Sequence, residues 1–339
     1  MDLLNRNLEL FARGEIIRGP VGSGPGYWAG APGVLYSIRE RVWYLTYRIR
    51  RPRGVEPDRG GEARIARSGD LKNWDDVWSV TKDKFDSASI ERCCLYHGTD
   101  GLWRYFVSYV DPADGRWCVS VLKAREPARL SPEKPEPVFK ARPLGLEGIK
   151  DPWILEQKGT LYMFVSIALP TSQTTTESHS TLDIFNTGEC VSATGLAISR
   201  DLDHWQWQGI VFRPEPAGWD RYCRRINSVL PHDGRFVAFY DGSANHAENY
   251  EEKTGLAVST DLRHWQTLTP DGPLCTSPHG SGSLRYLDAQ PAEKLIQVFY
   301  EFARPDGAHD LRLASAQAGL ADELVRAASA SQPATRPHG

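Results

Sequence analysis

The stretch Ser199-Arg200-Asp201-Leu202-Asp203-His204-Trp205 decides the fold, because the chain contains three versions of it. Residues 68–74 and residues 259–265 repeat its pattern, Ser-x-Asp-Leu-x-x-Trp. A phrase that recurs at wide spacing indicates repeated supersecondary units. Strand-forming residues precede each copy, and Ser and Asp side chains readily bond to nearby backbone N–H groups. Each copy therefore predicts a strand that runs into a turn, after which the tryptophan anchors the returning chain.

A second element, a short run of aromatic and β-branched residues, lies upstream of each copy. Its length and composition are typical of a strand. The same kind of run also occurs twice where the tryptophan phrase has decayed, so the runs are residues 42–47, 103–109, 161–166, 235–240 and 295–300. Before each run we expect a first strand, at residues 31–36, 91–96, 151–156, 227–231 and 281–286. Turn signals such as His232-Asp233-Gly234 join the two strands as in a hairpin.

Five antiparallel units rich in Trp and Tyr predict an all-β protein with the architecture of a five-bladed β-propeller. We expect one domain over residues 1–327. The Ala/Ser/Pro-rich end, residues 328–339, is predicted to be a disordered tail. A pair of β-sandwiches is the alternative architecture for the same strands.

Composition narrows the class of protein. The 339-residue chain has a formal net charge of −3, which gives no reason to expect a nucleic acid or an acidic membrane surface as a partner. We find no stretch apolar enough for a signal peptide or a membrane span, so we expect a cytoplasmic protein. The six cysteines show neither metal-ligand nor disulfide-framework spacing, so we expect free thiols and no metal or other cofactor. Nothing in the composition predicts the oligomeric state.

Two carboxylates open neighbouring first strands, Glu91 in the second unit and Asp151 in the third. In a propeller the first strands converge, so these side chains would face each other across a funnel. Cleavage of a glycosidic bond needs such a pair, because one carboxyl group protonates the leaving oxygen while another activates water or attacks the sugar. The structural alternatives are an ion pair between Glu91 and Arg92 and a turn built by Asp151-Pro152.

The three tryptophan phrases, together with Ile149-Lys150-Asp151-Pro152-Trp153-Ile154, resemble the five-bladed propeller glycosidases. That group holds the invertase and levansucrase families, the arabinanase and β-xylosidase family and the mannoside phosphorylase family. The resemblance covers roughly residues 25 to 318 and implies that Asp151 holds or tunes the site. It also implies an aspartate in the first unit as base or nucleophile, where this chain has Ala31-Pro32.

The missing carboxylate leaves two alternatives. Another residue can supply it, and the candidates are Asp241 and Glu301, which end the aromatic strands of the fourth and fifth units, and the acidic run at residues 248–252. Otherwise phosphate is the nucleophile and needs no base, as the mannoside phosphorylases imply. Arginine suits such an anion and also suits a sugar carboxylate. The arginines that could hold it are Arg48, Arg50, Arg64, Arg92, Arg224 and Arg225.

We predict a glycosidase, a hydrolase that acts on a small carbohydrate or glycoside. Asp151 positions or tunes the site, Glu91 does acid/base work, and Asp241 is the third member. The residues predicted to bind substrate are Trp28, Arg92, Trp153, Asn227, Arg225, His97 and Glu301. The long Thr/Ser-rich segment at residues 168–190 is predicted to be a lid. The alternatives are a glycoside phosphorylase, a non-catalytic carbohydrate-binding propeller, and a non-glycosidic reaction in a repurposed propeller.

Overall fold

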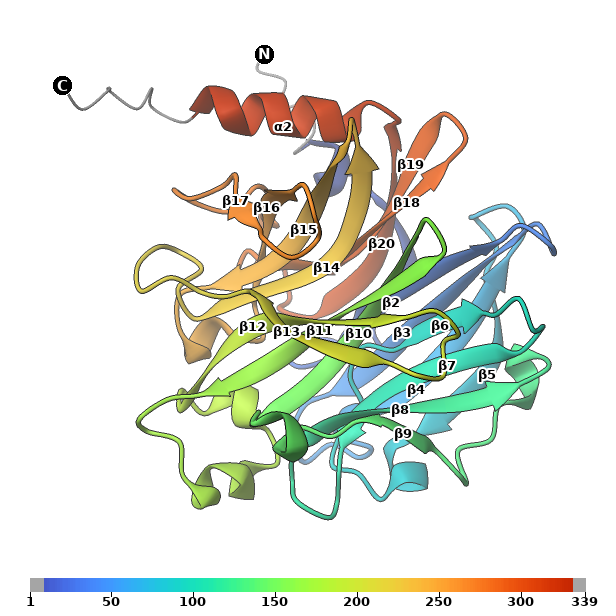
Figure 1. The fold of residues 1–339 in the computed structure, drawn as a ribbon, viewed down its shortest axis with the longest axis vertical. Helices are drawn as coiled ribbons and strands as arrows, with labels where there is room; N and C mark the ends of the chain where they lie inside the picture. The colour runs from blue at the N-terminus through green and yellow to red at the C-terminus, as the bar shows by residue number, and fades with distance from the viewer. Residues whose placement is uncertain (1–8, 332–339) are drawn as a thin grey trace.

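The computed structural model describes residues 9–331, and strands are its main secondary structure (Figure 1). The strands form one sheet of sixteen and one of four, and their antiparallel pairings divide them into five groups of four, which we call units. The first unit contains β2 (Trp28–Ser37), β3 (Val42–Arg51), β4 (Arg59–Ser68) and β5 (Asp75–Thr81). The second contains β6 (Cys94–His97), β7 (Trp103–Val110), β8 (Trp117–Ala124) and β9 (Glu136–Phe139). The third contains β10 (Gly148–Gln157), β11 (Thr160–Pro170), β12 (Cys190–Ser199) and β13 (Gln206–Phe212).

The last two units follow the same plan with one difference. The fourth contains β14 (Cys223–His232), β15 (Arg235–Ser243), β16 (Lys253–Ser259) and β17 (Gln266–Thr267). The fifth contains β18 (Leu284–Ala292), β19 (Leu295–Ala303) and β20 (His309–Gln317), and its fourth strand is β1 (Glu15–Arg18) from the N-terminal side. The two ends of the described chain therefore meet in one unit. The prediction of an all-β protein is confirmed.

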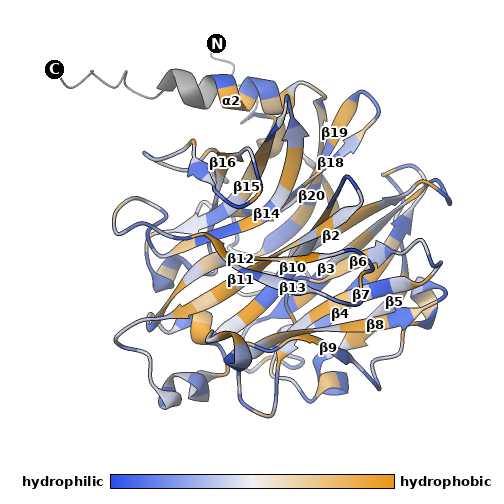
Figure 2. Ribbon diagram, in the orientation of Figure 1, coloured by the Kyte–Doolittle hydropathy of each residue, from blue (hydrophilic) through white to orange (hydrophobic). Residues whose placement is uncertain are grey.

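The first strands of the units contact one another in a cycle. Contacts join β2 to β6, β6 to β10, β10 to β14, β14 to β18 and β18 back to β2. Between them, the outer residues of the units pack in hydrophobic clusters, and each of five large clusters draws its side chains from two consecutive units. Figure 2 shows hydrophobic residues along the strands. The core is thus a set of layers between units rather than one central mass.

The repeated phrase forms the turn from the third strand to the fourth in units one, three and four. In each copy the serine Oγ accepts the leucine N–H at 2.9–3.0 Å. The aspartate Oδ1 accepts the next two backbone N–H groups at 2.8–2.9 Å. The leucine has a φ of 65–68° in all three, and its carbonyl accepts the tryptophan Nε1–H. The turn is therefore closed by local hydrogen bonds, as predicted.

The tryptophan of the phrase also joins neighbouring units. Its ring packs edge-on against a phenylalanine on the second strand of the preceding unit, with centroids 5.9–6.0 Å apart. The three pairs are Trp74 with Phe299, Trp205 with Phe106, and Trp265 with Phe164. Unit five needs no such turn, because its fourth strand comes from the N-terminal side. This explains why the phrase is missing there.

Two sequence expectations need revision. The first strand of unit five was expected at residues 281–286, but β18 runs over Leu284–Ala292. Helix α2 (Leu320–Ser331) was not predicted; its Leu320 and Leu324 pack on units four and five, and it takes in the first residues of the expected tail. Residues 332–339 of that tail lie outside the described residues. Across the described residues, no helix is long and apolar enough to cross a membrane.

Candidate active site

A bulge interrupts the first strand at corresponding positions in units one, three and five. The pairing with the second strand slips between Gly30 and Gly33, between Lys150 and Trp153, and between Arg285 and Asp288. The residue after the last regular pair has a positive φ in each case, 52° for Ala31, 55° for Asp151 and 53° for Tyr286. A positive φ is strained for residues with a side chain. Bulges re-aim side chains, and these three lie where the first strands face one another.

The carboxylate of Asp151 is buried and has one oxygen without a partner. The Arg92 backbone N–H donates to Oδ1 at 3.2 Å, while the Asp151 N–H donates to Ser108 Oγ at 2.8 Å. Oδ2 has no hydrogen-bond partner, and the nearest cation is Lys150 Nζ at 3.7 Å. The backbone therefore fixes this carboxylate and leaves one oxygen available to a ligand.

Glu91 is held in its ionised form. Arg48 donates to Oε2 at 2.6 Å, and Tyr286 OH donates to the same oxygen at 3.4 Å. Burial alone would raise the pKa of Glu91, but the surrounding positive charges, chiefly Arg48 and Lys150, lower it to about 2. A carboxylate with that pKa carries no proton to donate near neutral pH. Of the acid/base work predicted for Glu91, these surroundings favour the part of an ionised carboxylate over that of a proton donor.

Asp241 has the opposite environment. Its side chain has no solvent exposure, and the Tyr286 backbone N–H donates to its two oxygens at 3.0 and 3.3 Å. Burial outweighs the attraction of Arg225 and Arg285 and raises the pKa of Asp241 to about 6. Asp241 can therefore hold a proton close to neutral pH. Since Tyr286 also contacts Glu91, one residue connects an ionised carboxylate and a protonatable one.

Glu301 corresponds to Asp241 in strand register, as the sequence predicted, because Asp241 pairs with Arg225 and Glu301 pairs with Arg285. The Glu301 carboxylate accepts from Arg285 at 2.6 and 2.9 Å and from Arg48 at 3.3 Å, and its Oε1 lies 2.7 Å from His309 Nδ1. Despite burial, these partners, Arg285 above all, lower the pKa of Glu301 well below its usual value. We call Glu91, Asp151, Asp241, Tyr286 and Glu301 the central site.

Three other predicted residues lie at the central site. The Trp28 ring stacks on His309 with centroids 4.7 Å apart, and its Nε1 is buried without a partner. Arg225 bonds to Glu252, and the Nδ2 of Asn227, at the bulge of the fourth unit, is buried without a partner. The sequence analysis did not single out Tyr286, and it named Glu252, the partner of Arg225, only as part of the acidic run at residues 248–252.

Two predicted residues, Arg92 and Trp153, have other surroundings. Arg92 donates from Nε to the Pro32 carbonyl at 2.6 Å, from one terminal nitrogen to the Asn227 carbonyl at 2.8 Å and from the other to Asp288 at 3.1 Å. Trp153 Nε1 donates to Asp288 at 3.1 Å. Both side chains are therefore engaged in joining units.

His97 is a correction to the sequence analysis. It lies at the other end of β6 from Glu91, its ring stacks on Trp103 at 4.2 Å, and it lines a separate cavity of about 350 Å³ with Asp100 and Arg104. Six residues of chain separate His97 from Glu91, about 20 Å if they are extended, so the two side chains cannot reach one site. The structure therefore does not bring His97 to the central site.

The long segment of unit three covers the central site. It forms two short 3₁₀ helices, Thr176–Thr181 and Ile184–Asn186. The buried carboxylate of Asp183 accepts a hydrogen bond from Tyr250 OH and lies 3.4 and 3.6 Å from Arg53 and Arg59. The ring of Phe185 lies 4.7 Å from Lys150 Nζ. Contacts from units one and four thus hold this segment down over the carboxylates.

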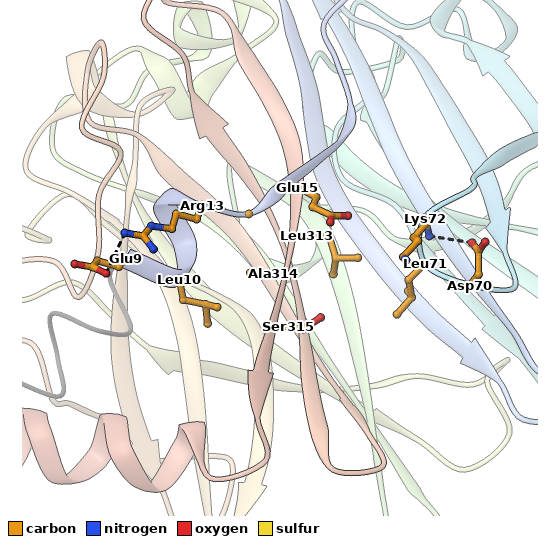
Figure 3. Close-up of a pocket in the computed structure, with 11 residues that line it drawn as sticks. Glu9, Leu10, Arg13, Glu15, Asp70, Leu71, Lys72, Leu313, Ala314 and Ser315 are labelled. Carbon is orange, nitrogen blue, oxygen red and sulfur yellow. Dashed lines mark hydrogen bonds and ion pairs between the residues drawn. The ribbon is translucent and has the colours of Figure 1, made fainter.

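A large cavity lies elsewhere. Figure 3 shows this groove of about 560 Å³, lined by residues 9–15, the first repeated turn and β20. Two of its charged groups, Glu9 and Arg13, form an ion pair with each other at 3.4 Å. Another cavity, of about 250 Å³, is lined mainly by the far ends of the first strands. Among residues 9–331 no group of three His, Cys, Asp or Glu side chains is arranged to hold a metal ion.

Comparison with known proteins shows which solved structures have a similar fold. A scan of protein-family models and a search of curated proteins find no match. Among solved structures, the chain is similar to a thermostable family-43 glycoside hydrolase, with a TM-score of 0.60 and 14% identity over 96% of this chain and 99% of that one. It is also similar to an endo-arabinase from Bacteroides thetaiotaomicron, with a TM-score of 0.57 and 15% identity over 89% and 97%.

A third similar structure is a β-1,2-mannobiose phosphorylase from Listeria innocua, with a TM-score of 0.60 and 12% identity over 92% and 95% of the two chains. The likeness therefore extends over nearly the full length of the chain and of each structure. It confirms the sequence resemblance to this group at the level of the fold.

Proposed function

We propose that the chain is a glycoside-cleaving enzyme built as one closed, five-bladed β-propeller domain. The five four-stranded units, the cycle of contacts between their first strands and the clusters between consecutive units support this architecture. The fold shared with two glycosidases and a glycoside phosphorylase supports the reaction class. A cytoplasmic location is part of the proposal and agrees with the six cysteines, which are free and buried.

The observation that carries the mechanism is the contrast between Asp241 and Glu91 at the two ends of Tyr286. Environments that push the pKa values of two carboxyl groups apart assign an acid and an ionised partner. Asp241, with a pKa of about 6, protonates the leaving oxygen. Glu91, with a pKa of about 2, stays ionised and stabilises positive charge on the sugar ring.

Asp151 acts as the base in this scheme. Its Oδ2 has no partner and accepts a proton from the attacking water, while Oδ1 and the bulged backbone keep the carboxylate in place. This assigns Asp151 a more direct part than the tuning role that the resemblance implies. Trp28 supplies an aromatic surface, of the kind that packs on the apolar face of a sugar.

The test compares Asp241→Asn and Asp151→Asn with the wild type on a panel of arabinosides, xylosides, fructosides and mannosides. General acid–base groups contribute roughly 10²–10⁴-fold, so we expect each variant to lose about that much turnover. The exposed Asp75→Asn serves as control and should keep full activity. In the wild type, kcat should fall as the pH rises above about 6, because Asp241 then loses its proton.

The stability of Asp241→Asn must be measured separately, and we expect it to exceed that of the wild type at neutral pH. The pKa of Asp241 is raised from 3.8 to about 6 on folding, so its contribution to stability is present at low pH and is lost as the pH rises through 6. Asparagine carries no such charge. Asp241→Asn should therefore be about 3 kcal/mol more stable than the wild type at pH 7, with the difference vanishing near pH 4. Inactivity combined with retained stability would identify a catalytic loss.

Phosphorolysis is the second candidate, because Arg50, opposite Trp28, is a buried arginine whose Nε has no hydrogen-bond partner and which could hold a phosphate. The same panel is therefore assayed with and without inorganic phosphate. Turnover only with phosphate would replace hydrolysis by phosphorolysis. No wild-type turnover on any glycoside under either condition would contradict the proposal and favour a carbohydrate-binding protein.

A further inference from the structure

The arginines around the central site are not equivalent. Arg48 pairs with Glu91 and Glu301. Arg225 pairs with Glu252, and Arg285 pairs with Glu252 and Glu301. These three guanidinium groups are therefore already neutralised by the protein and need no anion from outside.

Arg50 differs from them. It lies on β3 opposite Trp28 and is only 5% exposed, yet it makes no ion pair with any described residue. Its Nε is buried and has no hydrogen-bond partner. Its guanidinium carbon lies 4.6 Å from the centre of the Trp28 ring and 4.6 Å from that of Tyr250. Aromatic rings contact a guanidinium through its face, so the N–H groups at its edge remain for an acceptor.

An unpaired buried cation is costly to keep. Burial and the positive charge of Arg48 lower the pKa of Arg50 to about 10, so it still carries its charge at neutral pH. An anionic ligand would offset this cost, and the protein itself does not. Arg50 is thus a buried positive charge for which the described residues supply no counterion.

A second cation of the site, Lys150, has one distant counterion. Lys150 Nζ lies 4.9 Å from the Trp117 ring and 3.7 Å from Asp151 Oδ2, and it makes no hydrogen bond to a described residue. Both Lys150 and Arg50 lower the pKa of Glu91, so both belong to the central site. Further buried donors there have no partner, namely Trp28 Nε1, Arg48 Nε and Arg225 Nε. This excess of donors over acceptors suits a ligand rich in oxygen and negatively charged.

We propose that Arg50 binds an oxyanion in the central site, where Lys150 supplies a further positive charge, and that this oxyanion is either a carboxylate carried by the sugar or a phosphate. The two ligands share the chemistry that a guanidinium edge recognises, since both offer paired anionic oxygens. Arg64 and Arg224 are excluded from this role, because Arg64 pairs with Glu62 and Asp76 and Arg224 pairs with Glu215 and Asp220. This inference concerns anion binding, and its relevance to catalysis rests on the proposed function.

The experiment measures binding by calorimetry and thermal shift, without turnover. The full chain is titrated with inorganic phosphate, with glucuronate and with neutral glucose. We expect one of the two anions to bind the wild type, and glucose to bind more weakly. A charged hydrogen bond contributes about 1.5–3 kcal/mol, so Arg50→Gln should weaken binding of that anion about 10- to 150-fold. The exposed Arg67→Gln on β4 is the matched control and should bind as the wild type does.

The outcomes separate the two sources and the two hypotheses. Binding of phosphate assigns the site to a co-substrate, and binding of glucuronate assigns it to an acidic sugar. Failure of both anions to bind the wild type, or equal affinity in Arg50→Gln, overturns the inference. If Arg50→Gln does not fold, Arg50→Lys keeps the charge without the planar edge and should still lose affinity. The Asp241→Asn variant separates the two hypotheses, because anion binding and turnover are measured independently. We expect this variant to lose turnover and to keep anion binding.

Discussion

Ala31 stands where the resembling families carry an aspartate, and the structure fills that place from another strand. Glu301 reaches across from unit five, and its Oε2 accepts the Ala31 N–H at 3.0 Å. The neighbouring Gly30 makes this possible, because a Cβ on that residue would lie 1.9 Å from the same oxygen. A small residue at position 30 and a carboxylate at position 301 therefore belong together. Glu301 supplies the negative charge but is already committed to Arg48, Arg285 and His309.

The substitution Gly30→Ala tests this dependence. The added methyl group must displace the Glu301 carboxylate, which is buried and bonded on several sides. Overpacking of this kind costs about 1–3 kcal/mol, which urea unfolding at pH 7 would measure. Gly69→Ala is the matched control, because a Cβ there meets nothing within 4 Å. Equal loss of stability in the two variants would show that the contact with Glu301 has no special importance.

Individual site residues differed in how far the sequence could reveal them. Asp151, Asp241 and Glu301 could be found because each follows or opens a recognisable strand. Tyr286 could not be found from the sequence, because no sequence pattern predicts the bulge that shifts the first strand of unit five. Arg50 was one of six candidate arginines, and only the three-dimensional structure shows that the others have partners while Arg50 has no ion pair with a described residue.

At the level of elements, local bonding determines what could be predicted. All the hydrogen bonds of the repeated turn join residues within three positions of one another, so its seven letters contain its geometry. The phenylalanine that packs against each tryptophan lies on another unit, up to 225 residues away, and no local sequence pattern predicts this contact. The segment over residues 168–190 was recognised by length alone, whereas its fixed position depends on Asp183 and its partners.

Asp183→Asn should loosen this covering segment. The substitution removes the charge that Arg53 and Arg59 share, and losing a buried charged partner costs about 1–3 kcal/mol. We expect amide hydrogen exchange across residues 176–186 to accelerate about 5- to 150-fold, with the unfolding transition of the whole protein nearly unchanged. The exposed Glu177→Gln in the same segment is the control. Exchange rates that match the control would mean that Asp183 does not hold the segment in place.

Across the whole molecule, the first and last strands determine how the units close. The number of units followed from their repetition, but β1 has only four residues, and its pairing with β20 joins positions about 300 residues apart. No alternation of apolar residues marks it in the sequence. The partnership between the N-terminal and C-terminal parts could therefore be seen only in the structure.

Arg92 joins the units at their centre. From unit two its guanidinium reaches the Pro32 carbonyl of unit one, the Asn227 carbonyl of unit four and the carboxylate of Asp288 in unit five. Asp288 in turn accepts from Trp153 of unit three. A single ion pair with both side chains fully buried thus contacts all five units. Such a pair is expensive to break, because the remaining partner is left charged and without its counterion.

Arg92→Met should therefore destabilise the whole protein rather than one unit. Leaving Asp288 charged and unpaired costs about 3–5 kcal/mol, and guanidinium chloride unfolding should show that loss in one cooperative transition. Adding Asp288→Asn removes the stranded charge, so the double variant should recover part of the loss. Burial already raises the pKa of Asp288, and without Arg92 the single variant should regain stability as the pH falls and the carboxyl group takes up a proton. A loss that the second substitution does not relieve, and that does not change with pH, would mean that packing rather than charge makes Arg92 important.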